Sequence, residues 1–235
     1  HPLQEKMTLC WHDVVAVGAD RVPHGSIMRE HVRLLREHAL GRFPAMLAGI
    51  VRDPAPLLAL GGGASRKARP EEGVARHLLH RVTVGPGACT EADVREAARA
   101  LTGWFVLRGE LRHFEREHDD GAKTILGKTG PFADADLAAV AAAHPATARN
   151  VARRLYRWLV SEADAPDDAM LAPVAAAFGA DGDIARAVGT ILRSSRFFSD
   201  DAIRRRVKRP AELAIGIVRS LEGTEFPNEA NDYGH

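Results

Sequence analysis

Two histidines three residues apart, His77 and His80, are the side chains whose type and spacing most directly suggest chemistry. Residues three apart on a helix lie on neighbouring turns of one face, so both imidazoles could bind one metal ion. A stable zinc site needs three or four ligands, and His12, His38 or His118 would have to complete it. The pair therefore predicts either a metal site, with zinc as the possible ion, or a half-buried, hydrogen-bonded helix face with no cofactor.

Two further motifs place an imidazole beside carboxylates. His118 is followed by Asp119 and Asp120, a set that could orient a metal ion or relay a proton, or that could simply cap turns of a loop. His12 precedes Asp13 and offers a similar choice, because it is either a core histidine held by that carboxylate or a catalytic group.

Together with Arg76, these motifs give the candidate pocket of a hydrolase-like enzyme. Its members would be His12, Arg76, His77, His80, His118 and Asp119. Reacting groups must approach hydrogen-bond range, so side chains more than about 10 Å apart could not share one site. A Gly-x-Ser-x-Gly turn or a Cys/His signature, which would indicate other hydrolases, does not occur in the sequence.

Composition and charge exclude several function classes. The 235 residues are 46% hydrophobic and 27% charged, and 32 basic against 31 acidic residues give a net charge of +1, so we expect no nucleic-acid partner. Only five of the basic residues are lysines, and we interpret the excess of arginine as composition rather than as phosphate binding. Cys10 and Cys89 are too few for a disulfide framework, and no apolar run reaches the length of a transmembrane segment.

The elements that would position these side chains are mostly helices. In the stretch from Pro70 to Gly85, Val74, Leu78 and Val82 recur at four-residue spacing, which predicts a continuous amphipathic helix carrying both histidines. Apolar periodicity and capping residues predict further helices at 2–17, 26–38 with Ser26 as its cap, 44–52, 54–60, 90–102, 134–143, 145–160, 167–178, 183–194 and 210–221.

One segment interrupts the helical pattern. Residues 104–114 alternate apolar and polar side chains around Arg108-Gly109, which predicts a short β-hairpin. The polar, glycine-containing segment 115–131 predicts an extended loop. The expected fold is therefore mainly α, with nine to eleven helices in a single domain over 1–221 and a disordered or surface-bound tail at 222–235.

Several stretches resemble the uncharacterised bacterial family known as domain of unknown function 1800. They run in collinear order over nearly the whole chain and read PLQEKMTLCWHD (2–13), LLREHALGRFPAML (34–47), PEEGVARHLLHRVTVG (70–85), TEADVREAARALTGW (90–104), HDDGAKTILGKTG (118–130), HPATARNVARRLYRWLV (144–160) and KRPAELAIGIVRSL (208–221). The resemblance implies a largely helical protein with an extracytoplasmic location, periplasmic or secreted. It also implies a longer N-terminal region, so we expect this chain, which begins at His1, to be a processed form or a fragment.

The departures from the family pattern concern its polar positions. Where members read Trp-His-Asn-His-Phe, this chain keeps His12 but has Val14 in place of the second histidine. In the helix around Arg76, members carry glutamate at the places of His77 and His80. An imidazole that is mostly neutral at pH 7 replaces an anion, which would alter any acid/base or hard-metal role.

These observations support two hypotheses. The first is a degenerate, non-catalytic protein of the cell envelope that binds a protein or a cell-surface partner. The second is the hydrolase-like enzyme with the six candidate residues, working with or without a metal ion. A third and weaker interpretation is anion or polysaccharide binding by the basic run from Arg204 to Arg209, which could equally be a solvated charge cluster.

Overall fold

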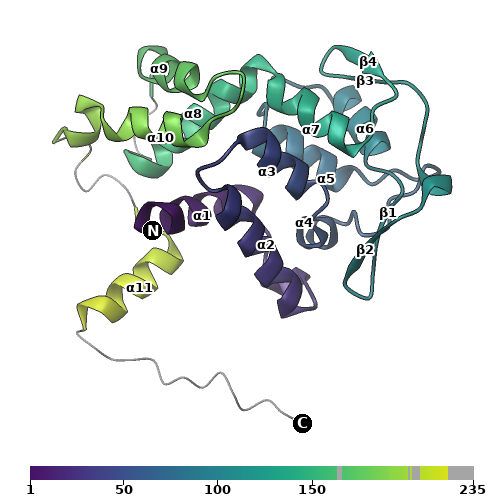
Figure 1. The fold of residues 1–235 in the computed structure, drawn as a ribbon, viewed down its shortest axis with the longest axis horizontal. Coiled ribbons are helices and arrows are strands. Elements are labelled where there is room, and N and C mark those ends of the chain that lie inside the picture. Colours follow the sequence, from purple (N-terminus) through teal and green to yellow (C-terminus); the bar gives the residue numbers. More distant parts are fainter. Residues whose placement is uncertain (163–165, 201, 203–206, 222–235) are drawn as a thin grey trace, which may run out of the picture.

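The computed structural model describes residues 1–162, 166–200, 202 and 207–221 of the chain (Figure 1). The tail expected at 222–235 and the basic residues Arg204 to Arg206 lie outside these ranges.

The described chain is mainly helical, as the sequence predicts. The α-helices are α1 (Pro2–Val15), α2 (Gly25–His38), α3 (Phe43–Ile50), α4 (Pro54–Ala59), α5 (Glu72–Arg76), α6 (Glu91–Ala100), α7 (Asp134–Ala143), α8 (Pro145–Leu159), α9 (Asp168–Phe178), α10 (Ile184–Leu192) and α11 (Pro210–Ser220). Short helical turns are η1 (Ala19–Arg21), η2 (His77–Val82), η3 (Glu115–Glu117) and η4 (Ser195–Phe198).

Local capping chemistry fixes several of these boundaries. The side chain of Asp53 accepts a hydrogen bond from the Ala55 amide and caps α4, while Thr90 and Asp93 form a reciprocal capping box at α6. The predicted cap Ser26 is wrong: α2 starts one residue earlier, at Gly25, and its N-cap residue His24 makes no side-chain cap bond.

The helix expected from Pro70 to Gly85 is not one continuous α-helix. It begins as α5 at Glu72 and continues from His77 as a π-helical segment, η2. The amide and the hydroxyl of Thr83 both donate to the Leu78 carbonyl, each at 2.9 Å, which closes the wider five-residue turn. The wider turn leaves Leu78, Leu79 and Val82 all buried, whereas both histidines stay half-buried.

Two antiparallel hairpins follow α6, and only the first was predicted. Strands β1 (Trp104–Leu107) and β2 (Glu110–His113) pair as expected around Arg108-Gly109. Strands β3 (Lys123–Ile125) and β4 (Lys128–Gly130) form a second hairpin inside the segment expected to be a loop.

The turns of the two hairpins share one backbone conformation, but their strands differ in length. Arg108 and Gly109 have φ of 54° and 81°, and Leu126 and Gly127 have 51° and 77°, so both central residues of each turn are left-handed. This is the arrangement of the tight turn that joins hairpin strands. The flanking strands β3 and β4 are only three residues long, which is too short for a visible alternation of apolar residues.

Aromatic side chains connect the beginning and the end of the described core. The rings of Trp11 and Phe43 lie 5.7 Å apart, and those of Phe43 and Phe178 lie 5.6 Å apart, so α1, α3 and α9 share one contact. Trp11 also donates from its indole nitrogen to the Ala39 carbonyl at 3.0 Å. Helices α8, α9 and α10 pack together on one side of the molecule, and the first hairpin lies on the opposite side (Figure 1).

Helix α11 is apolar, as predicted, but it lies away from the body of the fold beside α1 (Figure 1). Leu213, Ile215 and Ile217 are each about half exposed, at 49%, 50% and 50%. Lys6 on α1 pairs with Glu212 at 3.1 Å, so polar contacts contribute to holding this helix in place. No helix within the described ranges is both long enough and apolar enough to cross a membrane.

Candidate functional site

Arg76, one of the six predicted site residues, belongs to a surface ion-pair network. Its guanidinium donates to Glu72 at 2.8 Å and to both oxygens of Glu91, at 2.6 and 2.7 Å. These hydrogen bonds raise the pKa of Arg76 above its ordinary value, and the bond to Glu91 contributes more than the bond to Glu72. The residue thus ties α5 to the start of α6.

His118 and Asp119 are held at the other end of α6. Nδ1 of His118 lies 2.9 Å from the Thr102 carbonyl oxygen, and Asp119 accepts from Arg99 at 2.7 Å. The hydrogen bond from Arg99 lowers the pKa of Asp119. Buried Lys123 then donates to the Asp119 carbonyl at 2.5 Å, so this motif anchors the segment that leads into the second hairpin.

His12 faces α2. Its ring centroid lies 5.7 Å from that of His31, and burial, followed by the charge of His31, lowers its pKa, while the charge of Asp13 opposes the shift. Asp13 makes no hydrogen bond to His12 among the described residues, and its carboxylate instead lies 3.7 Å from the guanidinium of Arg209.

His77 lies against the end of α1. Burial, followed by the nearby charge of Arg81, lowers its pKa, and the carbonyls of Val14 and Val15 act in the opposite direction. Its Nε2 atom is buried without a hydrogen-bond partner among the described residues, and the same holds for Nε2 of His80.

The six predicted residues therefore have different partners. Within the described part of the chain, no hydrogen bond or ion pair joins any two of them. His77 and His80 have one neighbour in common, Arg154. The charge of Arg154 lowers the pKa of His77, and His80 lines the same cavity as Arg154. Direct cooperation of all six in one reaction stays a prediction.

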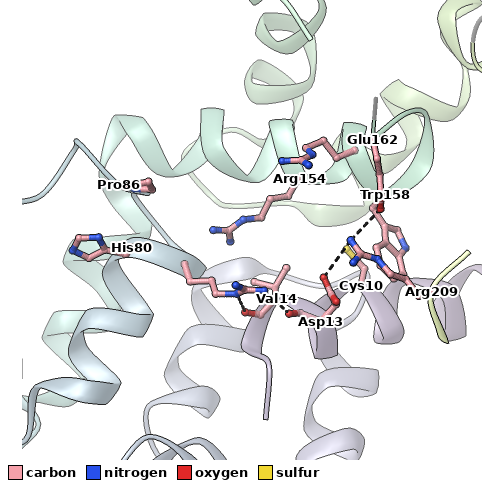
Figure 2. A pocket seen from close by; sticks show the side chains of 11 residues that line it. Cys10, Asp13, Val14, His80, Pro86, Arg154, Trp158, Glu162 and Arg209 are labelled. Atoms are coloured by element: carbon pink, nitrogen blue, oxygen red, sulfur yellow. Dashed lines mark hydrogen bonds and ion pairs between the residues drawn. The ribbon is translucent and has the colours of Figure 1, made fainter. Parts of the chain in front are cut away.

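A cavity of about 480 Å³ lies between α1, η2, α8 and the start of α11, and among the six residues His80 lines it (Figure 2). His80 and Pro86 lie at one end, and Trp158 and Arg209 at the other (Figure 2). Its lining consists of Cys10, Asp13, Val14, His80, Arg81, Pro86, Arg154, Arg157, Trp158, Glu162 and Arg209. Four arginines against two carboxylates give this wall a positive charge.

Arg154 is the most unusual of these side chains. Burial lowers its pKa to about 10, while Cys10 acts in the opposite direction and the charge of Arg81 adds to the lowering. Its guanidinium donates to the Val82 carbonyl at 2.8 Å, at the end of the π-helical segment, and no carboxylate pairs with it among the described residues. Neighbouring Asn150 donates to the next carbonyl, that of Thr83, at 2.5 Å. Arg154 is therefore a mostly buried cation that caps a helix end and still lines the cavity.

The opposite end of the cavity is already neutralised. Nη2 of Arg209 lies 3.0 Å from Oε1 of Glu162, an ion pair whose atoms are not aligned for a hydrogen bond, and its guanidinium carbon lies 5.8 Å from the ring centroid of Trp158. Asp13 and Glu162, the two carboxylates of the cavity, thus pair with Arg209. Among the described residues, neither forms an ion pair with Arg154.

Sequence reasoning missed Arg154 and Arg81 because it interpreted the abundance of arginine as composition. A local signal was present: Arg154 and Arg157 are three residues apart on α8, whose apolar stripe Val151, Leu155 and Trp158 is otherwise ordinary. The sequence alone could not show that Arg154 lies over the end of another helix. Groups of three or more metal-binding side chains are absent from the described residues, including around His77 and His80.

Comparison with known proteins identifies the family. No curated protein matches the chain, and no solved structure matches it. The model of one family, described as "Protein of unknown function (DUF1800)", matches residues 1–235. The chain belongs to this family over its whole length.

Proposed function

We propose that this protein is a non-catalytic binding protein whose cavity takes an acidic group, a carboxylate or a phosphate, of a partner in the cell envelope. The observation that carries the proposal is the guanidinium of Arg154, which is mostly buried, faces the cavity and has no carboxylate partner among the described residues.

The physical argument concerns the cost of burying a charge. A buried ion is normally paired, because the hydration that it loses must be replaced by an opposite charge or by several hydrogen bonds. The Val82 carbonyl supplies one acceptor. An arginine can donate two parallel hydrogen bonds to a carboxylate or a phosphate, so an acidic ligand would supply the missing charge.

Neighbouring residues support the same ligand chemistry. Within the described part of the chain, Arg81 makes only long contacts, of 3.4 Å, to the carbonyls of Val14 and Asp13. Arg157 lines the cavity with an exposed side chain. Both arginines are placed to add positive charge near Arg154.

Support for binding rather than catalysis comes from the two histidines. The resemblance described above implies glutamates at the places of His77 and His80, and burial lowers the pKa of His77, which favours its neutral ring. A neutral imidazole does not provide the anionic base that a glutamate would provide there.

The test is a calorimetric titration of the full chain with inorganic phosphate, with acetate and with a short peptide rich in aspartate. We expect binding that weakens as salt concentration rises, and that weakens at least tenfold in Arg154→Gln, which removes the charge but retains an amide donor toward Val82. Arg153→Gln is the matched control, because it removes an exposed charge from the neighbouring position of α8.

Two results would contradict the proposal. One is the absence of measurable heat with all three probes at low salt. The other is equal weakening by Arg153→Gln and Arg154→Gln, which would indicate a general effect of charge on α8. Asn150→Ala separates the structural role, since it removes a cap from the same helix end and should lower stability without reducing binding.

The cell-envelope location is part of the proposal and has its own measurement. Fractionation of the producing cells should recover the protein outside the cytoplasm. Crosslinking in that fraction should capture a partner with the native chain and not with Arg154→Gln, whereas a purely cytoplasmic protein would contradict this part.

A further inference from the structure

A second polar arrangement lies at the contact of α1, α2 and α4, and it does not depend on the acidic-ligand proposal. Nδ1 of His31 lies 2.6 Å from Oδ2 of Asp53. Both side chains are buried, with 0% and 5% of their surface exposed. Such a short contact inside the core fixes the orientation of the imidazole ring.

The partner of Nδ1 determines the role left for the other ring nitrogen. Oδ1 of Asp53 accepts from the Ala55 amide at 2.9 Å as the cap of α4, and Oδ2 faces Nδ1 of His31. A carboxylate at this position accepts a hydrogen bond from an Nδ1–H of His31. When the ring is neutral with its proton on Nδ1, Nε2 carries the lone pair, whereas in the charged ring Nε2 carries a proton that a bound metal ion would replace. This Nε2 atom is buried and has no hydrogen-bond partner among the described residues.

An unpartnered nitrogen in the core is costly. Leaving a buried acceptor unsatisfied costs about 1 to 3 kcal/mol, so a buried histidine normally finds a second partner. The combination of a carboxylate on one ring nitrogen and an open lone pair on the other is the arrangement that orients metal-binding histidines in proteins.

His12 is the side chain adjacent to this ring. The two ring centroids are 5.7 Å apart, with the planes tilted by 59°. Two imidazoles bound to one tetrahedral ion, with metal–nitrogen distances of about 2.0 to 2.1 Å, would have their centroids about 5 Å apart. The observed centroid separation is somewhat larger than this value.

We propose that His12 and His31 together bind one divalent transition-metal ion, with Zn²⁺ as the best match, and that Asp53 is the positioning residue for His31. His12 is half-buried and provides the route by which the ion reaches the pair. Two protein ligands leave the remaining positions to water or to a ligand oxygen, so the ion is held less tightly than in a four-ligand structural site.

The chain contains an internal comparison for this pair. His113 and His118 also have neighbouring rings, 5.9 Å apart, but His113 is exposed. Nδ1 of His118 is hydrogen-bonded to the Thr102 carbonyl, and no carboxylate of the described residues forms a hydrogen bond with either ring. Ring proximity is therefore common to both pairs, whereas the buried, carboxylate-oriented nitrogen distinguishes His31.

The experiment is a titration of the full chain, freed of metal with a chelator, against Zn²⁺ alone in competition with a chromophoric chelator. We expect one equivalent of Zn²⁺, lost in His12→Ala and weakened about 10- to 100-fold in Asp53→Asn, since asparagine retains the α4 cap but no longer fixes the ring nitrogen. The double variant His113→Ala/His118→Ala should bind as the native chain does.

A second measurement gives a readout in the native chain. Addition of Zn²⁺ should shift the NMR signals of the His12 and His31 rings before those of other histidines. Circular dichroism checks that the variants fold, and His12→Ala is the main variant because its side chain is only half-buried.

The proposal is overturned if the native chain binds no Zn²⁺, or if His12→Ala binds it as tightly as the native chain. It is equally overturned if binding disappears in His113→Ala/His118→Ala, because the ion would then occupy the other pair of rings.

Discussion

At the scale of single residues, the environment of each histidine decides its chemistry more than its neighbours in the sequence. His12 is affected by His31, which is nineteen positions away, and His77 by Arg81 and Arg154. In both, burial is the largest cause of a lowered pKa, so the folded protein keeps these rings neutral under conditions that would charge them in the unfolded chain.

A pH dependence of stability follows from these shifts. As pH falls through the ordinary histidine pKa of 6.5, the unfolded chain takes up protons that folded His12 and His77 do not, so the free energy of unfolding should decrease. The decrease should continue until the pH reaches the lowered pKa values of the folded state. Urea unfolding at about pH 7.5, 6.5 and 5.5 measures it, and His77→Gln should reduce the slope. An unfolding free energy that rises over this interval would contradict the prediction.

At the scale of secondary structure elements, short-range hydrogen bonds fix where helices begin. The capping box at α6 has Asp93 donating its amide to the Thr90 hydroxyl at 3.2 Å, and the Thr90 amide donating to the Asp93 carboxylate at 2.8 Å. Asp93 also accepts from the Leu126 amide at 2.7 Å, which ties the second hairpin to the same helix end.

Removal of this cap should destabilise the protein by a predictable amount. Thr90→Ala should lower the free energy of unfolding by about 1 kcal/mol, because a helix-end amide loses its acceptor. Thr90→Ser is the control and should retain most of the stability. Urea titrations followed by circular dichroism measure the midpoint, and equal midpoints for Thr90→Ala and Thr90→Ser would show that the hydroxyl does not contribute.

At the scale of the whole molecule, the contacts of Trp11, Phe43 and Phe178 join residues far apart in the sequence. We therefore predict that residues 1–221 unfold as one domain in a single transition. Phe178→Ala should lower the free energy of unfolding by about 3 to 5 kcal/mol, because it leaves a cavity at this contact.

Phe198 offers a matched control, since its ring is 70% exposed and Phe198→Ala should change stability by less than about 1 kcal/mol. Tryptophan fluorescence and far-ultraviolet circular dichroism should give the same midpoint in the native chain. Two separate transitions, with only one shifted by Phe178→Ala, would divide the chain into independent domains.

The sequence by itself determined the features that depend on neighbouring residues. The mainly helical fold and the first hairpin follow from side-chain periodicity and local turn chemistry, and the structure confirms them. Motifs spread along the chain also sufficed for the family, which the family comparison confirms. The second hairpin was missed because its strands are three residues long and leave little pattern.

Only the tertiary structure decided which polar side chains meet. The π-helical segment, the burial of Arg154 over its end and the pairing of His31 with Asp53 all depend on segments brought together by packing. The shift of a pKa or the lack of a partner depends on the surroundings in space, and these are not encoded in the spacing of residues along one helix. For that reason, the sequence named His77 and His80, while the structure directs attention to Arg154 and to the contact between His12 and His31.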